Sequence, residues 1–215
     1  MLQAERPSAA IGHRATSSRP LYFHRMRTKL RRGLVLALVV LGLPSVASLL
    51  VGSLLVLTGQ IVHLLAAGTL IKEDVVITAG PYRHVRNPMY VGSFLTDLGF
   101  CWIACSPLVA LIWLPLFYLG VIHPRVKAEE ERMLSLHGDP YQAYLDRVPR
   151  YLPSLAPRMP ARGGGFSWAQ VIKNGEASRQ LHHFAFPLFL YAKLCLVSLQ
   201  GGDAWTLRGV PAQLH

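Results

Sequence analysis

A polar stretch between two apolar regions carries side chains that could bind a charged ligand. It runs from Asp74 to Tyr90 and reads DVVITAGPYRHVRNPMY. Gly80-Pro81 is typical of a turn, and Pro88 favours an extended Asn87 followed by the first turn of a helix. Free N–H groups at a helix N-terminus can hold a carboxylate, and the tyrosines offer flat faces for an aromatic ring. The alternative is a basic loop that touches lipid phosphates.

A second polar stretch, from Arg125 to Pro153, supplies the carboxylates that the first one lacks. Arg125 and Glu129 are four residues apart and would share one face of a helix that Pro124 begins. They could therefore reach one ligand or each other, and because a surface pair of this kind contributes only tenths of a kcal/mol, stability hardly explains it. The alternative for the run from Glu129 to Glu131 is a solvated acidic face. We predict that the two stretches form one site.

Apolar blocks must position these residues. Only 15% of the residues are charged, whereas soluble domains have about a quarter. Residues 33–71 carry no formal charge, and as one helix they would be about 58 Å long, roughly twice the hydrocarbon thickness of a bilayer. They are therefore predicted to cross twice, with a turn near Pro44. A second hairpin turning at Ser106, and a further apolar block at Phe184–Leu199, predict an all-α integral-membrane bundle of four core spans plus a fifth.

The net charge of +11 and its placement predict orientation and partners. Segments 1–32, 72–89 and 124–183 hold 20 of the 22 lysines and arginines, which places the N-terminus and both polar stretches in the cytoplasm. Because these basic residues flank apolar blocks, anionic lipid is the expected partner rather than nucleic acid. The sequence leaves the oligomeric state open.

The same blocks divide the chain into four regions. They are a basic, disordered cytoplasmic tail (1–32), a membrane core (33–153), a linker with a cytoplasmic helical segment (154–183), and an extra span with a tail (184–215). The alternative for the Arg- and Ser-rich tail is an organelle transit segment.

Several residues within the apolar blocks could be read in two ways. Gln60, His63 and Asp97 could line the entry path of a ligand or hydrogen-bond to one another inside the bundle. Cys101 and Cys105 lie one helical turn apart, but no further ligand has suitable spacing. Core packing, and no metal site, is therefore expected of the two cysteines.

The order of motifs resembles that of a known family. GPYRHVRNPMY followed by EE, then G, YxxY and VPRYLP, is similar to the isoprenylcysteine carboxyl methyltransferase and phospholipid methyltransferase superfamily. The resemblance covers about residues 46–153. It implies a multi-span helical enzyme that binds S-adenosyl-L-methionine at the cytoplasmic face and methylates a lipophilic acceptor, through a carboxylate, an amine or a thiol.

The resemblance also implies a role for individual residues. The cofactor site would include Asp74, Val75, Val76, Ile77, Tyr82, Arg86, Asn87, Pro88, Met89, Tyr90, Glu129 and Glu130. Arg125 would face the acceptor. No catalytic base is assigned, although His84 or Glu130 could accept the proton of an amine acceptor. Asn87 stands where the prenylcysteine branch commonly has histidine. An asparagine at this position is more similar to the broad bacterial or lipid-amine methyltransferases.

Two other functions are open to a chain of this kind. One is a membrane reductase of the sterol-reductase type, which resembles this superfamily in its fold and binds NADPH. The other is a non-catalytic membrane scaffold whose basic tail binds anionic lipid.

Overall fold

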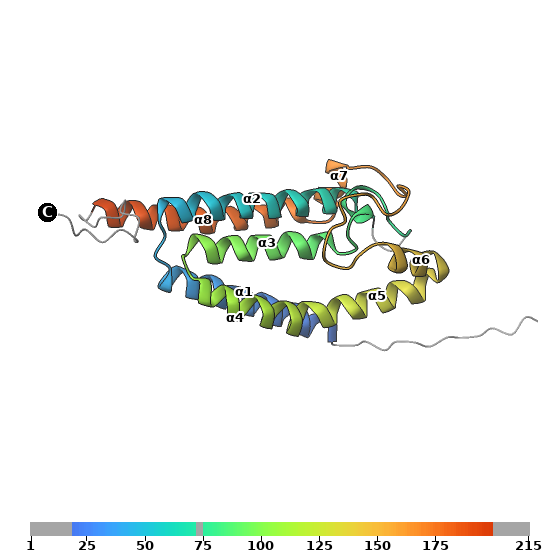
Figure 1. The fold of residues 1–215 in the computed structure, drawn as a ribbon, viewed down its shortest axis with the longest axis horizontal. Coiled ribbons are helices and arrows are strands. Elements are labelled where there is room, and N and C mark those ends of the chain that lie inside the picture. The colour runs from blue at the N-terminus through green and yellow to red at the C-terminus, as the bar shows by residue number, and fades with distance from the viewer. Residues whose placement is uncertain (1–18, 72–74, 200–215) are drawn as a thin grey trace, which may run out of the picture.

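The computed structural model describes residues 19–71 and 75–199, and these contain helices and loops but no strand (Figure 1). The helices are α1 (Arg19–Leu41), α2 (Val46–Thr69), α3 (Pro88–Ile103), α4 (Pro107–Phe117), α5 (His123–His137), α6 (Asp139–Arg147), α7 (Trp168–Lys173) and α8 (Glu176–Leu199), with a 3-10 turn η1 (Gly80–Arg83) and a π-helical turn η2 (Tyr118–Ile122). The all-α fold class is confirmed.

Two tight turns lie at one end of the bundle, where the sequence predicted them (Figure 1). The first contains Pro44 and ends at Ser45, whose side chain caps α2 in a reciprocal pair of hydrogen bonds with Ser48. The second turn, between α3 and α4, meets the first through a hydrogen bond from the Leu43 N–H to the Ala104 carbonyl, 3.2 Å long. Segments 75–87 and 148–167 lie at the opposite end, with α5 and α6.

Helices α2 and α3 are packed closely because glycines face each other across the interface. A Cβ atom on Gly59 would lie 2.6 Å from the Gly92 carbonyl oxygen, and one on Gly92 would lie 2.6 Å from the Gly59 carbonyl oxygen. Small residues of this kind allow helix backbones to approach each other in membrane proteins. The close packing holds the beginning of α3, where the polar stretch ends, against the C-terminal half of α2.

The outer surface of the bundle is apolar. Two helical stretches are long and apolar enough to cross a membrane: α2 and the continuous rod Pro107–His137, which comprises α4, η2 and α5. A shorter apolar stretch, His183–Leu196, lies within α8. Leucines point outward, among them Leu50 and Leu111 with 69% and 71% of their surface exposed. Outward-facing leucines on long apolar helices are typical of a protein whose solvent is lipid.

Polar side chains inside the bundle hydrogen-bond to one another. Asp97, 1% exposed, accepts hydrogen bonds from Arg31 Nε and Nη2 at 3.1 and 2.5 Å and from the Tyr118 hydroxyl at 3.0 Å. Gln60 Nε2 donates to Thr96 Oγ1 at 2.8 Å. His63 Nε2 lies 2.8 Å from Ser93 Oγ. Gln60, His63 and Asp97 therefore hydrogen-bond inside the bundle, but to other side chains and not to one another as the sequence analysis suggested.

Two expectations from the sequence are wrong in detail. Part of the predicted disordered tail is helical, since α1 begins at Arg19 and Arg31 is held by the buried carboxylate of Asp97. Cys105 is exposed at the turn after α3, and only Cys101 of the pair is buried. Pro124 lies in the first turn of α5 as predicted, and η2 joins that turn to α4 without a break.

The C-terminal region packs along the bundle. Asn174 Nδ2, just after α7, donates to the carbonyls of Ala67 and Leu70 at 2.8 and 3.0 Å and so satisfies the C-terminal end of α2. Lys193, a cation within an apolar helix, donates to the carbonyls of Val39 and Gly42 at the end of α1. The charge of Lys193 is therefore stabilised by the negative end of a helix.

Candidate functional site

The two polar stretches meet where α3 begins. Arg125 Nε on α5 donates a hydrogen bond to the Tyr90 hydroxyl oxygen at 2.8 Å. The same hydroxyl donates to Glu129 Oε2 at 3.4 Å. The prediction that the two stretches come together is confirmed, and the ligand-binding roles of these three residues remain predictions.

This Tyr90–Arg125–Glu129 cluster is open to a ligand. Glu129 is exposed and Arg125 is half-buried. Among the residues that the structure describes, the terminal guanidinium nitrogens of Arg125 and Oε1 of Glu129 form no further hydrogen bond. The cluster thus presents a carboxylate and a guanidinium side by side, which suits a ligand with both an ammonium and an anionic group.

Glu130, the neighbour of Glu129, is turned inward and binds basic residues. It is 6% exposed, and its carboxylate accepts hydrogen bonds from Arg150 Nε and Nη2 at 3.0 and 2.7 Å. Arg86 Nη1 lies 3.5 Å from its other oxygen, and Asn87 Nδ2 donates to that oxygen at 3.4 Å. Glu130 therefore joins the end of the first polar stretch to the VPR segment of the second, and these bonds occupy the oxygens that a proton acceptor would need free.

The amides at the beginning of α3 do not all face a ligand. The Tyr90 and Val91 N–H groups both donate to the Asn87 carbonyl, at 3.1 and 3.2 Å. The expectation that the N–H groups around Asn87 and Tyr90 hold a carboxylate is therefore wrong for Tyr90. Pro88, which has no N–H, is buried at the first helical position as predicted.

Tyr82 is a structural residue in this arrangement. It is 8% exposed and packs with Ala66, Ile77 and Met89. Its carbonyl oxygen accepts a hydrogen bond from the Tyr144 hydroxyl at 2.9 Å. Burial raises the pKa of Tyr82 well above its usual value, and the carboxylate of Glu129 raises it further. Tyr82 and Met89 thus belong to one buried cluster, and little of the Tyr82 ring is open to a ligand.

His84 has one ring nitrogen that is not used in its hydrogen bond to Ser154. Its Nδ1 lies 2.8 Å from the Ser154 carbonyl oxygen, which can only accept a hydrogen bond, so the proton is on Nδ1. In the neutral ring Nε2 then carries a lone pair, with which His84 could accept a proton.

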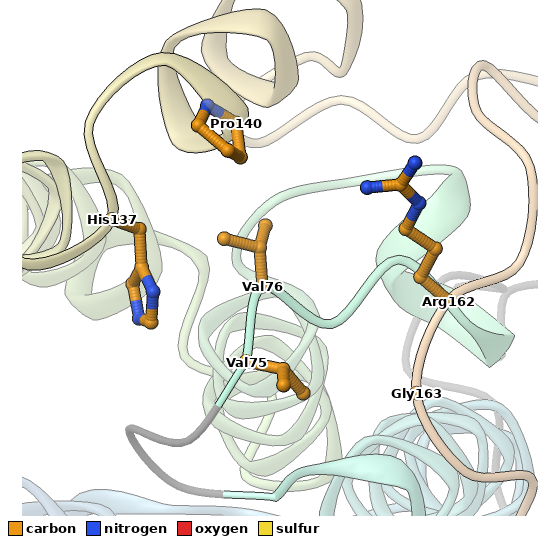
Figure 2. A pocket seen from close by; sticks show the side chains of 6 residues that line it. All are labelled: Val75, Val76, His137, Pro140, Arg162 and Gly163. Carbon is orange, nitrogen blue, oxygen red and sulfur yellow. The ribbon is translucent and has the colours of Figure 1, made fainter.

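Val75 and Val76 line an open hollow of about 370 Å³, together with His137, Pro140, Arg162 and Gly163 (Figure 2). His137 Nε2 is buried and has no hydrogen-bond partner among the described residues. The hollow has apolar walls at Val75, Val76 and Pro140 and polar side chains at His137 and Arg162, a combination that suits a flat heteroaromatic ring. Asp74 lies outside the described residues, and Ile77 is buried behind the hollow, against Gly163.

Residues 149–162 form a strap across the first polar stretch. Backbone hydrogen bonds run from Arg86 N to the Pro149 carbonyl, from Ser154 N to the His84 carbonyl, and from Arg158 N to the Arg83 carbonyl, at 2.8 to 3.0 Å. Thr78 Oγ1 donates to the Pro160 carbonyl at 2.6 Å. These bonds hold the irregular segment 75–87 in place, since it has no regular backbone ladder of its own.

Sequence reasoning missed the residues that close the site from its far side. His137 and Arg162 belong to no recognisable motif, and Arg162 lies in the segment predicted to be a linker. Arg150 carried a signal, because it belongs to the VPRYLP motif. Among the described residues no group of three or more histidine, cysteine, aspartate or glutamate side chains could hold a metal ion.

Long apolar helices with outward leucines, and a cluster of polar side chains where helices α3 and α5 meet, are typical of a helical membrane protein with a polar end to its bundle. Comparison with known families agrees. Residues 40–135, a little under half of the chain, match the isoprenylcysteine carboxyl methyltransferase (ICMT) family.

The relatives cover part of the chain and part of their own length. The chain is 30% identical over 115 residues to the protein-S-isoprenylcysteine O-methyltransferase of Schizosaccharomyces pombe, an alignment that covers 54% of this chain and 48% of the relative. It is 28% identical over 117 residues to the protein of the same name from Xenopus laevis, covering 49% and 40%. It is 31% identical over 85 residues to the nickel-cobalt-cadmium resistance protein NccN of Alcaligenes xylosoxydans xylosoxydans, covering 40% and 39%. The aligned part is thus less than half of each relative. No solved structure matches the chain.

Proposed function

We propose that the chain is a membrane methyltransferase that transfers a methyl group from S-adenosyl-L-methionine to a lipophilic acceptor at the cytoplasmic face. The observation that carries this proposal is the Tyr90–Arg125–Glu129 cluster, in which the two halves of the family motif meet within hydrogen-bonding distance.

The described residues fit this cofactor at two places. The exposed carboxylate of Glu129 suits an ammonium group. The hollow at Val75 and Val76 suits an adenine ring, and the unpartnered Nε2 of His137 can hydrogen-bond to a ring nitrogen or amine. Glu129 and His137 are eight residues apart on α5, about 12 Å along the helix axis. An extended ligand with a nucleoside at one end and an amino acid at the other can bridge this distance.

The cofactor supplies an electrophilic methyl group, so the protein mainly needs to position the acceptor and exclude water. In this proposal Arg125 faces the acceptor, because its terminal nitrogens are uncommitted beside Tyr90. Glu130 holds Arg86, Asn87 and Arg150 in place around the cofactor. A carboxylate or thiolate acceptor needs no base, whereas an amine acceptor could lose its proton to His84 Nε2.

The membrane arrangement in this proposal has four core spans, α1, α2, α3 and the apolar part of the rod (α4 with η2), with α8 as a fifth. Both tight turns then lie on the outer side, where they carry no lysine or arginine. The site, the strap and α5 to α7 lie in the cytoplasm, together with the N-terminus.

Ligand binding and product formation test the proposal. The full chain, purified in detergent, is titrated with S-adenosyl-L-methionine and separately with NADPH by isothermal calorimetry. The expected result is binding of S-adenosyl-L-methionine and no heat from NADPH. Transfer of a labelled methyl group into a total lipid and small-molecule extract, followed by mass spectrometry, then identifies the acceptor. Binding of NADPH alone would indicate a reductase, and binding of neither ligand would favour a lipid-binding scaffold.

A further inference from the structure

The rod that carries Arg125 and Glu129 contains one turn wider than an α-helix. In η2 the His123 N–H donates to the Tyr118 carbonyl, five residues back. The next residue, Pro124, has no N–H to donate, and in a regular helix its ring would clash with the carbonyl four residues earlier. A π-turn relieves this clash. It inserts one extra residue and lengthens the helix by less than the usual rise per residue.

The positions of the buried side chains along the rod are shifted by the extra residue. Before η2 the buried side chains are Leu114 and Phe117, and from the last residue of η2 onward they are Ile122, Val126 and Glu130. In a helix of 3.6 residues per turn, a buried stripe through Leu114 and Phe117 would continue through positions 121 and 125. The observed stripe passes through positions 122 and 126, one residue later.

This shift decides which side chains of α5 enter the site. Val126 is 0% exposed and packs with Phe117 and Ile122, at the place where an uninterrupted helix would bury the guanidinium of Arg125. With the extra residue, Arg125 and Glu129 lie at the edge of the buried stripe, beside Tyr90. The buried position one turn further on is taken by Glu130, whose partners Arg86 and Arg150 compensate its charge.

Helix α3 contacts the rod at the first residue of η2 and again beyond η2. Tyr118, the first residue of the turn, donates to Asp97 Oδ2 at 3.0 Å, and Arg125 beyond the turn donates to Tyr90 at 2.8 Å. Asp97 and Tyr90 lie seven residues apart on α3, so they share one face of that helix. Both contacts depend on the residue count between Tyr118 and Arg125.

We propose that η2 sets the rotation of α5 relative to α4. Its one extra residue, imposed by Pro124, turns Arg125 and Glu129 toward Tyr90 and so assembles the ligand site. This inference rests on the proposed function only for its second readout. Pro124 and the residues of η2 are positioning residues, because they act through α5 and touch no ligand.

The test removes the extra residue. Gly120 lies in η2 with open space around it. Deleting Gly120 together with Pro124→Ala should turn η2 into a regular helix and leave both ends of the rod in their present register. Two matched variants should break the register, since each rotates one end by about 100° relative to the other: insertion of an alanine after Gly120, and deletion of the exposed Leu111 from regular helix.

The first readout needs no ligand. Val126→Cys, in a background with the three native cysteines replaced by alanine, is probed with a maleimide in detergent. We expect protection in the parent and in the Gly120-deleted, Pro124→Ala chain, and at least tenfold faster labelling after the alanine insertion. Rapid labelling in the Gly120-deleted chain, or continued protection after the insertion, would overturn the inference.

The second readout is calorimetric binding of S-adenosyl-L-methionine. The Gly120-deleted, Pro124→Ala chain should bind within about threefold of the parent, and the insertion and the Leu111 deletion should weaken binding at least tenfold. Loss of binding in the Gly120-deleted chain as large as in the Leu111 deletion would overturn the inference. A parent chain that binds no S-adenosyl-L-methionine would instead refute the proposed function, and the maleimide readout would still decide the register.

Discussion

The Tyr90 hydroxyl lies 3.4 Å from a carboxylate oxygen of Glu129, although 39 residues separate the two in the sequence. Tyr90 is in the first turn of α3 and Glu129 is in the middle of α5. Arg125 donates to the same hydroxyl, so one phenol oxygen connects both polar stretches. A ligand that contacts any one of these side chains is within reach of the other two.

Replacing Glu129 with alanine should weaken the binding of S-adenosyl-L-methionine at least tenfold. A hydrogen bond to a charged group contributes about 1.5–3 kcal/mol, which corresponds to tenfold or more in affinity. The measurement is isothermal titration of the purified variant in detergent.

Glu131→Ala is the matched control for that experiment. Glu131 is an exposed acid on the same helix, and replacing it removes the same charge from the chain. The affinity of this variant for S-adenosyl-L-methionine should stay within about twofold of the parent. Equal weakening by both variants would point to a general charge effect and against a direct contact of Glu129.

Glu130→Gln should lower the free energy of unfolding and have little effect on the rate of methyl transfer. The substitution removes the charge that compensates Arg150 and Arg86, and we expect the free energy of unfolding to fall by about 1.5–3 kcal/mol. Thermal unfolding in detergent measures the loss. If Glu130 is instead the catalytic base, methyl transfer should fall at least a hundredfold while the unfolding midpoint stays unchanged.

Asp97→Leu should destabilise the bundle by about 3 kcal/mol, because it leaves Arg31 without its buried partner. The double variant Arg31→Met, Asp97→Leu should recover much of this loss, since no uncompensated charge remains. Denaturation midpoints of the two variants and the parent provide the comparison. A double variant less stable than Asp97→Leu alone would indicate that Arg31 has another stabilising contact.

Stability should decrease at high pH as Tyr141 ionises. Burial raises the pKa of Tyr141 to about 12 in the folded chain, with a further contribution from the Glu130 carboxylate, against 10.0 for an ordinary tyrosine. Because the folded pKa is the higher one, the stabilisation is complete below pH 10 and is lost as the pH rises from about 10 to about 12. Unfolding midpoints across this range should fall less steeply for Tyr141→Phe than for the parent.

The apolar blocks and prolines predicted much of the fold. Pro44 and Ser106 lie at the two tight turns, and Pro88 begins α3, because proline and the capping residues restrict the local backbone whatever the tertiary context. Pro124 lies in the first turn of α5 for the same local reason. The π-turn η2, which joins α5 to α4, was not predicted from the sequence.

The sequence by itself determined that this chain is helical, that its outer surface is apolar, and that two polar stretches carry the motif of one superfamily. These properties depend on residue types and on spacing along a single helix. The tertiary structure decided that Glu129 faces outward beside Tyr90 while Glu130 turns inward to Arg150, and that the segment around Arg162 closes the site. Neighbouring glutamates look alike in the sequence, and their different roles arise from the rotation of α5 against α3, which long-range packing sets.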